Sequence, residues 1–158
     1  MSDQWYTPKY VFDAMGNPRF DMDVSAPKLI PAYINARRWL WENSLETEWE
    51  GFIWMNAPYG GRNGLEPWLD QFSAHGNGIA LVPDRTSAPW FQKIARKADR
   101  MLFVTPKIKF LRPNGELGKQ PGNGTALLAI GERGTHCLEI AQLKGLGFLV
   151  APVRGFDL

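Results

Sequence analysis

Short apolar runs alternate with stretches of helical spacing along most of the chain. Runs of this length are typical of strands buried on both faces, and they occupy residues 52–55, 79–82, 101–104 and 125–130. An alternation of apolar and acidic residues predicts a strand at 20–24, and 148–150 predicts a last one. Helices are expected at 8–15, 65–72, 88–97 and 136–144. This order predicts an α/β layered domain with a mostly parallel, open sheet flanked by helices.

Two stretches are less regular. Residues 31–50 contain Trp39, Trp41 and Trp49 and are predicted to be helical or irregular. The Gly- and Pro-rich tract at 113–124 is predicted to be a loop.

Length and composition fit one domain. The chain has 158 residues, of which 44% are hydrophobic, so we expect a single domain over residues 1–158. Cys137 has no partner for an intramolecular disulfide, and His75 and His136 lack the spacing of metal ligands, so we expect no metal site. No stretch approaches the roughly 20 apolar residues of a membrane span, and the first residues lack a signal-peptide pattern, which favours a cytoplasmic protein.

The net charge of +2 conceals an uneven distribution. Residues 93–119 contain eight Lys or Arg side chains against two Asp or Glu. Such a segment is typical of a surface that faces a polyanion such as nucleic acid. For Arg96, Lys97 and Arg100 the solvated side of a helix explains the charge equally well.

An apolar run ends abruptly in the turn Asn56-Ala57-Pro58-Tyr59. The Asn56 side-chain oxygen and the Ala57 carbonyl could each accept one N–H of an exocyclic amine and draw its lone pair back onto nitrogen. Tyr59 offers a flat face for a base taken out of the stack. This arrangement suits methyl transfer to the amine of adenine. An ordinary Asn-Pro type loop after a buried strand is the alternative.

Two further features have both a functional and a structural explanation. Thr7 is expected to cap the first predicted helix and Pro8 to lie in its first turn. The free amides of this helix could hold an anion, although helix capping alone accounts for both residues. Asp23 ends the strand at 20–24, at the edge where α/β sheets bind ligands, but an acidic residue is common there.

Seven motifs occur in a family order between residues 5 and 130, and together they resemble the phage-type DNA adenine methyltransferases. The motifs are Trp5-Tyr6-Thr7-Pro8, Phe20-Asp21-Met22-Asp23-Val24-Ser25-Ala26, Asn43-Ser44-Leu45 with Trp49, Asn56-Ala57-Pro58-Tyr59-Gly60, Leu81-Val82-Pro83-Asp84-Arg85-Thr86, Trp90-Phe91, and Ile108-Lys109-Phe110 before Thr125-Ala126-Leu127-Leu128. The resemblance implies a small Rossmann-like class I methyltransferase that uses S-adenosylmethionine.

The resemblance also implies roles for individual residues. The methyl-donor pocket would contain Tyr6, Thr7, Pro8, Asp23, Ser25, Ser44, Leu45 and Asn56. The target-base site would contain Asn56, Ala57, Pro58 and Tyr59. Double-stranded DNA would contact Arg62, Arg85, Thr86, Trp90, Lys107, Lys109, Arg112 and Lys119.

Other implications concern the whole protein. The loop at 105–124 would be an insertion that contacts DNA, with no separate target-recognition domain. The protein would be a monomer or a homodimer, needing no metal, encoded by a phage or prophage and located in the bacterial cytoplasm.

Three positions depart from the family pattern. Ala57 replaces the usual proline, which keeps the carbonyl but loosens the turn. Pro106-Lys107 replaces Gly-Arg, which keeps the charge but loses bidentate recognition. Ser25 replaces a common cysteine.

The expected activity is adenine-N6 methylation at specific DNA sites. Two alternatives stay open: methylation of a protein glutamine, and a non-catalytic protein that binds DNA or the donor. Methylation of cytosine carbon 5 needs a thiolate nucleophile, and Cys137 lies outside any suitable loop.

Overall fold

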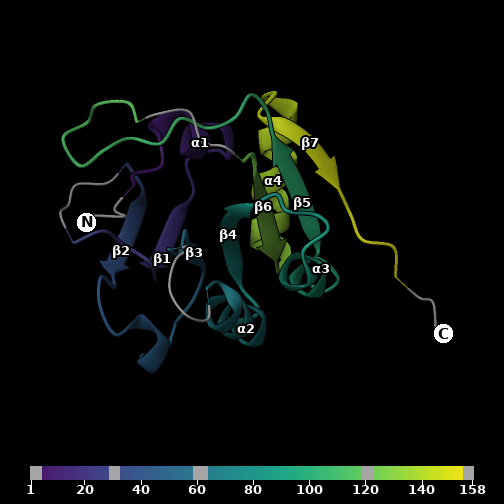
Figure 1. The fold of residues 1–158 in the computed structure, drawn as a ribbon, viewed down its shortest axis with the longest axis horizontal. Coiled ribbons are helices and arrows are strands. Elements are labelled where there is room, and N and C mark those ends of the chain that lie inside the picture. The colour runs from purple at the N-terminus through teal and green to yellow at the C-terminus, as the bar shows by residue number, and fades with distance from the viewer. Residues whose placement is uncertain (1–4, 29–32, 59–63, 119–122, 155–158) are drawn as a thin grey trace.

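The computed structural model describes residues 5–28, 33–58, 64–118 and 123–154. In these residues a seven-stranded sheet lies between two layers of helices (Figure 1). The strands are β1 (Arg19–Asp23), β2 (Asn35–Trp39), β3 (Ile53–Met55), β4 (Gly78–Pro83), β5 (Arg100–Val104), β6 (Thr125–Ile130) and β7 (Gly147–Val150). The α-helices are α1 (Lys9–Ala14), α2 (Glu66–His75), α3 (Pro89–Ala95) and α4 (Glu132–Leu143), and Ser44–Glu46 forms a 3-10 turn.

The sheet is mixed, so the prediction of a mostly parallel sheet is wrong. The strand order is β2-β1-β3-β4-β6-β5-β7. The pairs β1–β2, β1–β3 and β3–β4 are parallel, whereas β4–β6, β5–β6 and β5–β7 are antiparallel. The longest ladder is the antiparallel one between β4 and β6, which pair over their full length.

The connections explain this error. No α-helix lies between β5 and β6 in the described residues, and β6 returns antiparallel between β4 and β5. Helix α4 then carries the chain across β5 to β7. Apolar runs such as Thr125–Ile130 look the same in parallel and antiparallel strands when both faces are buried, so the pattern of hydrophobic residues did not reveal the direction.

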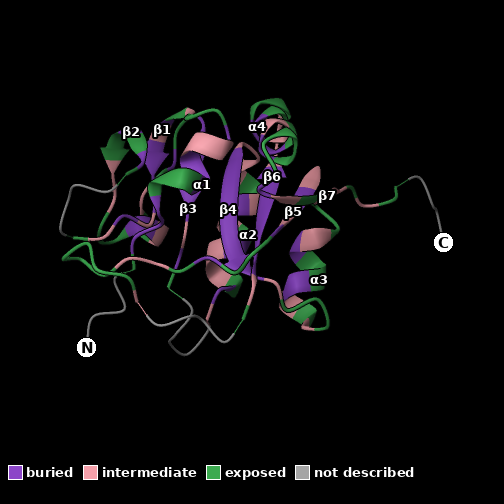
Figure 2. Ribbon diagram, turned by 90° about the horizontal axis from the view of Figure 1, so that it is seen from above, coloured by how far each residue is buried: buried purple, intermediate pink, exposed green. Residues whose placement is uncertain are grey.

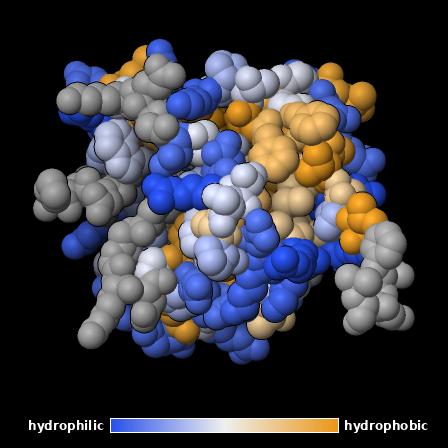
Figure 3. All heavy atoms as spheres, turned by 45° about the vertical axis from the view of Figure 1, so that its right-hand side comes forward, coloured by the Kyte–Doolittle hydropathy of each residue, from blue (hydrophilic) through white to orange (hydrophobic). Residues whose placement is uncertain are grey.

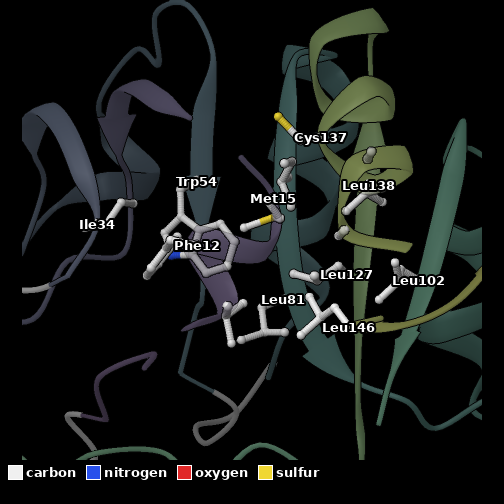
Figure 4. Close-up of a cluster of buried hydrophobic side chains, with 14 of the residues drawn as sticks. Phe12, Met15, Ile34, Trp54, Leu81, Leu102, Leu127, Cys137, Leu138 and Leu146 are labelled. Carbon is white, nitrogen blue, oxygen red and sulfur yellow. The ribbon is translucent and has the colours of Figure 1, made fainter. Parts of the chain in front are cut away.

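The two faces of the sheet have separate cores. Helices α1 and α4 cover one face, where Phe12, Trp54, Leu127 and Leu138 belong to one buried cluster (Figure 4). Helices α2 and α3 cover the other face, where Phe72, Phe91 and Leu128 belong to a second cluster. Strands β4 and β6 are buried almost throughout (Figure 2).

Strand β2 lies within the segment predicted to be helical or irregular. It is an edge strand, and only Ala36 among its five residues is buried. Arg37 and Arg38 are exposed, which is how edge strands commonly avoid pairing with other chains. A strand without an apolar face gives no periodic signal, and this explains why it was missed.

Helix α1 begins at Lys9, one residue later than predicted, and lacks the expected cap at Thr7. Its N-cap residue is Pro8, and no side chain donates or accepts a capping hydrogen bond there. Gly16 follows the helix with a φ of +86°, as expected for a glycine that ends a helix. Because α1 has only six residues, it gives little support for an anion site at its N-terminus.

Exposed hydrophobic side chains occur on and beside the edge strand β7. Figure 3 turns this side of the molecule toward the viewer and colours hydrophobic residues orange. The most exposed are Leu143, Phe148 and Val153. In the part of the chain that the structure describes, no helix is long and apolar enough to cross a membrane.

Candidate active site

A cavity of about 530 Å³ lies at the carboxyl ends of β1, β2 and β3. Its size is that of a site for a small organic ligand or cofactor. Parallel strands β2, β1 and β3 end side by side, and the segments that follow them supply most of the wall. The lining residues are Trp5, Val24, Ser25, Ala26, Pro27, Leu40, Trp41, Glu42, Asn43, Ser44, Asn56, Ala57, Pro58, Trp68 and Phe110.

Asn56 is fixed from two directions. Its backbone N–H donates to Ser25 Oγ at 2.6 Å, and its side-chain Nδ2 donates to Thr7 Oγ1 at 3.2 Å. Thr7 therefore holds the side chain of Asn56 rather than capping α1. With Nδ2 engaged in this way, Oδ1 keeps its lone pairs for another donor.

Ala57 is 2% exposed and Pro58 is exposed, and both line the cavity. No hydrogen bond of the Ala57 N–H occurs within the described residues. Tyr59, the last member of the predicted target-base site, lies outside those residues.

Asp23 is buried, with 3% of its surface exposed, at the end of β1. Its Oδ1 accepts hydrogen bonds from the Ser25 N–H at 3.0 Å and the Ser25 hydroxyl at 3.4 Å. Burial raises the pKa of Asp23 from 3.8 to about 7, against the lowering effect of the two Ser25 hydrogen bonds. Asp23, Ser25 and Asn56 thus form a connected hydrogen-bonded row across the ends of β1 and β3.

A smaller cavity lies beside this row. Its walls include Trp5, Tyr6, Thr7, Asp23 and Asn56. Of the residues predicted for the donor pocket, Pro8 and Leu45 line neither cavity in the described residues.

The segment after β2 contributes to the cavity wall. It contains the predicted turn at Asn43 and Ser44, and also two lining residues, Trp41 and Glu42, that the sequence did not suggest. Asn43 adopts a φ of +54° before the 3-10 turn, and buried Ser44 accepts hydrogen bonds from the Trp49 indole N–H at both its carbonyl and its hydroxyl. Glu42 could have been predicted as a site residue because it is acidic and follows a strand closely. It was missed because β2 itself was not predicted to be a strand.

Trp5 and Phe110 close another side of the cavity. They come from segments far apart in sequence that pair through two backbone hydrogen bonds between Tyr6 and Leu111, at 2.8 and 2.9 Å. The pairing brings the first motif of the chain against the segment that follows β5.

The predicted DNA-contacting residues divide into groups. Arg85 and Thr86 are exposed after β4, at the same edge of the sheet as Asn56. Lys107, Lys109 and Arg112 are exposed on the segment after β5. Arg62 and Lys119 lie outside the described residues.

Trp90 lies elsewhere. It packs on α3, with its ring 5.8 Å from that of Phe91, and it does not line the 530 Å³ cavity.

The basic segment is split by the fold. Arg96 and Lys97 follow α3, and Arg100 begins β5 at the amino end of that strand, away from the cavity. Lys93 forms an ion pair with Asp70 at 3.1 Å. Arg96, Lys97 and Arg100 all lie outside α3, so the solvated side of a helix does not account for them, and their position sets them apart from the cavity. In the described residues no group of three His, Cys, Asp or Glu side chains could hold a metal ion.

A cavity at the carboxyl ends of parallel strands, with the Glu42 carboxylate and aromatic rings in its wall, lies where open α/β sheets bind their ligands. Residues 1–140 match the family model described as DNA N-6-adenine-methyltransferase (Dam), and the chain belongs to that family. The resemblance drawn from the seven motifs is therefore confirmed. Searches of curated proteins and of solved structures gave no match.

Proposed function

We propose that this protein transfers the methyl group of S-adenosylmethionine to the N6 amine of adenine at specific sites in double-stranded DNA. The observation that carries the proposal is the position of Asn56. The residue lies in the wall of a ligand-sized cavity, and Ser25 and Thr7 hold its backbone and side chain. A fixed acceptor of this kind is what methylation of a weakly nucleophilic amine requires.

The lining of the cavity fits the methyl donor. Glu42 is a carboxylate that could accept hydrogen bonds from both ribose hydroxyls, and Trp41 and Trp68 offer faces for an adenine ring. Asp23, at the end of β1 and in the wall of the adjoining smaller cavity, would attract the positive end of the donor. S-adenosylmethionine supplies a methyl group on a positively charged sulfur, which makes that group electrophilic.

The target amine would be held by two oxygens. Asn56 Oδ1 would accept one N–H and the Ala57 carbonyl the other, which directs the nitrogen lone pair out of the ring toward the methyl group. The proton lost from nitrogen after transfer is acidic and needs no strong base. Phe110 and Trp5 line the same cavity and would exclude water around the flipped base.

DNA would approach the edge of the sheet that carries the cavity. Arg85, Lys107, Lys109 and Arg112 are exposed on segments that follow β4 and β5. Their charges would contact backbone phosphates.

The test is transfer of a radiolabelled methyl group from S-adenosylmethionine to DNA that lacks methylated adenine. We expect label in the DNA and N6-methyladenine after digestion. Label found only in protein, or donor binding without any product, would overturn the proposal. The same donor is also offered with RNA and with a glutamine-containing protein extract. The substrate that takes up the label then distinguishes DNA methylation from methylation of RNA or protein.

Asn56→Ala serves as the site-specific test. It should lower turnover by one to three orders of magnitude, roughly the loss of one oriented transition-state acceptor, and leave the donor dissociation constant within about threefold. Asn77→Ala is the matched control, because Asn77 precedes β4 at the opposite edge of the sheet. Turnover of Asn56→Ala equal to that of the parent protein would exclude the proposed role.

A further inference from the structure

Residues 110–118 form a small hairpin that is joined to the N-terminal segment. Leu111 bridges to Leu117 within the hairpin, and the Gly118 N–H donates to the Phe110 carbonyl at 2.9 Å. On its other side Leu111 pairs with Tyr6. Leu111 therefore lies between Tyr6 of the N-terminal segment and Leu117 of the hairpin. This pairing joins the hairpin to the segment that borders the cavity.

The side chain of Trp5 contacts both the cavities and the hairpin. It lines both the main cavity and the smaller one. Its ring packs so closely over Gly118 that a Cβ atom there would overlap it, and the Arg112 guanidinium lies 6.0 Å from the ring centroid. Trp5 is nonetheless 42% exposed and lines the cavity, so a ligand there can reach it.

We propose that Trp5 is a positioning residue that couples the cavity to the hairpin, so that the methyl donor and DNA each strengthen the binding of the other. This inference rests on the proposed function. A ligand in the cavity covers the exposed part of the Trp5 ring and holds the ring in place. The fixed ring then holds Gly118 and Arg112, and with them the charged face of the hairpin that meets DNA phosphates.

The experiment measures the DNA dissociation constant with and without saturating S-adenosylhomocysteine, a donor analogue without the methyl group. The probe is a fluorescent duplex cut from DNA without methylated adenine, at one fixed salt concentration. For the parent protein we expect the analogue to tighten DNA binding about 5- to 150-fold, the usual range of coupling between two sites. The same factor should appear when the analogue is titrated with and without DNA, because coupling is reciprocal.

Two different changes act on the ring. Trp5→Ala removes it, and Gly118→Ala displaces it while leaving Trp5 and Arg112 in the chain. Both should reduce the coupling factor to within about twofold of one. Gly118→Ala, which removes no side chain from the cavity wall, should also change DNA binding without the analogue less than about threefold. Trp5→Phe should restore part of the coupling. Phe148→Ala is the control, since that exposed ring lies on β7, at the far edge of the sheet, and its loss should leave coupling intact.

The outcomes separate the inference from the function on which it rests. A parent protein that methylates DNA but shows no coupling would overturn the inference and leave the function standing. Coupling that survives in both Trp5→Ala and Gly118→Ala would also overturn it. A parent protein that binds neither analogue nor DNA would instead overturn the proposed function. Folding of each variant is checked by the thermal unfolding midpoint, and Trp5→Phe provides the measurement if Trp5→Ala does not fold.

Discussion

Asp23 has a carboxyl group that the fold makes costly to ionise. Its pKa is raised by burial from 3.8 to about 7, so the folded protein holds a proton there that the unfolded chain has released. The contribution of Asp23 to the free energy of unfolding should therefore fall as the pH rises from about 4 to about 7. Three pKa units correspond to a loss on the order of 4 kcal/mol.

Asp23→Asn removes the charge and keeps an acceptor for the two Ser25 hydrogen bonds. We expect the variant to be more stable than the parent protein at pH 8 and to show little difference at pH 4, measured by urea unfolding. Its affinity for S-adenosylmethionine at pH 8 should fall at least tenfold, because a cationic ligand prefers the ionised carboxylate. Asp21→Asn, on the same strand but lining neither the main cavity nor the smaller one that Asp23 lines, should leave donor affinity unchanged. Equal donor affinity in the parent protein and Asp23→Asn would contradict this role.

Ala57 is the second residue whose chemistry can be tested alone. Its N–H makes no hydrogen bond in the described residues, so a proline there would lose none. Because proline restricts the backbone, Ala57→Pro should hold the carbonyl acceptor more firmly and increase the rate of methylation, with donor affinity unchanged. Ala57→Gly changes the turn in the opposite direction and should be slower than the parent protein. A slower Ala57→Pro with normal stability would show that the looser turn is needed.

The segments after β4 and β5 carry the charge that we assign to DNA binding. Lys107 and Lys109 are exposed before the hairpin of residues 110–118. If both contact phosphates, Lys107→Ala with Lys109→Ala should reduce the slope of log K against log salt by roughly two. Arg96→Ala with Lys97→Ala removes the same charge from the opposite edge of the sheet and should change the slope little. Equal slopes for the two double variants would place the DNA elsewhere.

The elements differ in how well the sequence predicts them. Runs such as Ile79–Val82 and Thr125–Ile130 are buried on both faces, and the predicted strands lie where the structure has them. Strand β2 escaped prediction because Arg37 and Arg38 face solvent on an edge. Its omission also concealed Glu42, since an acidic residue at a strand end stands out only once the strand is known. Trp5 and Phe110 could not be brought together from sequence, because their meeting depends on the backbone pairing of Tyr6 with Leu111.

At the scale of the whole molecule, the parallel and antiparallel halves of the sheet have different tasks. Strands β2, β1 and β3 are parallel, and their adjacent carboxyl ends surround the cavity. Strands β6, β5 and β7 are antiparallel to their neighbours and contribute no residue to its wall in the described part of the chain. The sequence predicted β1, β3 and β4 of the parallel half but missed β2. The direction of the other half depends on the order of β6 between β4 and β5, which local patterns do not contain.

Because the cavity lies within the parallel half of the sheet, a methyl donor bound there should raise the free energy of unfolding. The cavity walls come from residues 5–68 and from Phe110, so a bound ligand links the N-terminal segment, three strands, α2 and the segment after β5. S-adenosylhomocysteine at 100 times its dissociation constant should stabilise the folded state by about 2.7 kcal/mol and raise the thermal unfolding midpoint by roughly 5–11 °C. ATP should produce a much smaller rise, because with its ribose at Glu42 its phosphates would take the place of the positive end of the donor, near Asp23 at the carboxyl end of β1. A larger rise with ATP than with S-adenosylhomocysteine would mean that the cavity is built for a phosphorylated nucleotide instead of a methyl donor.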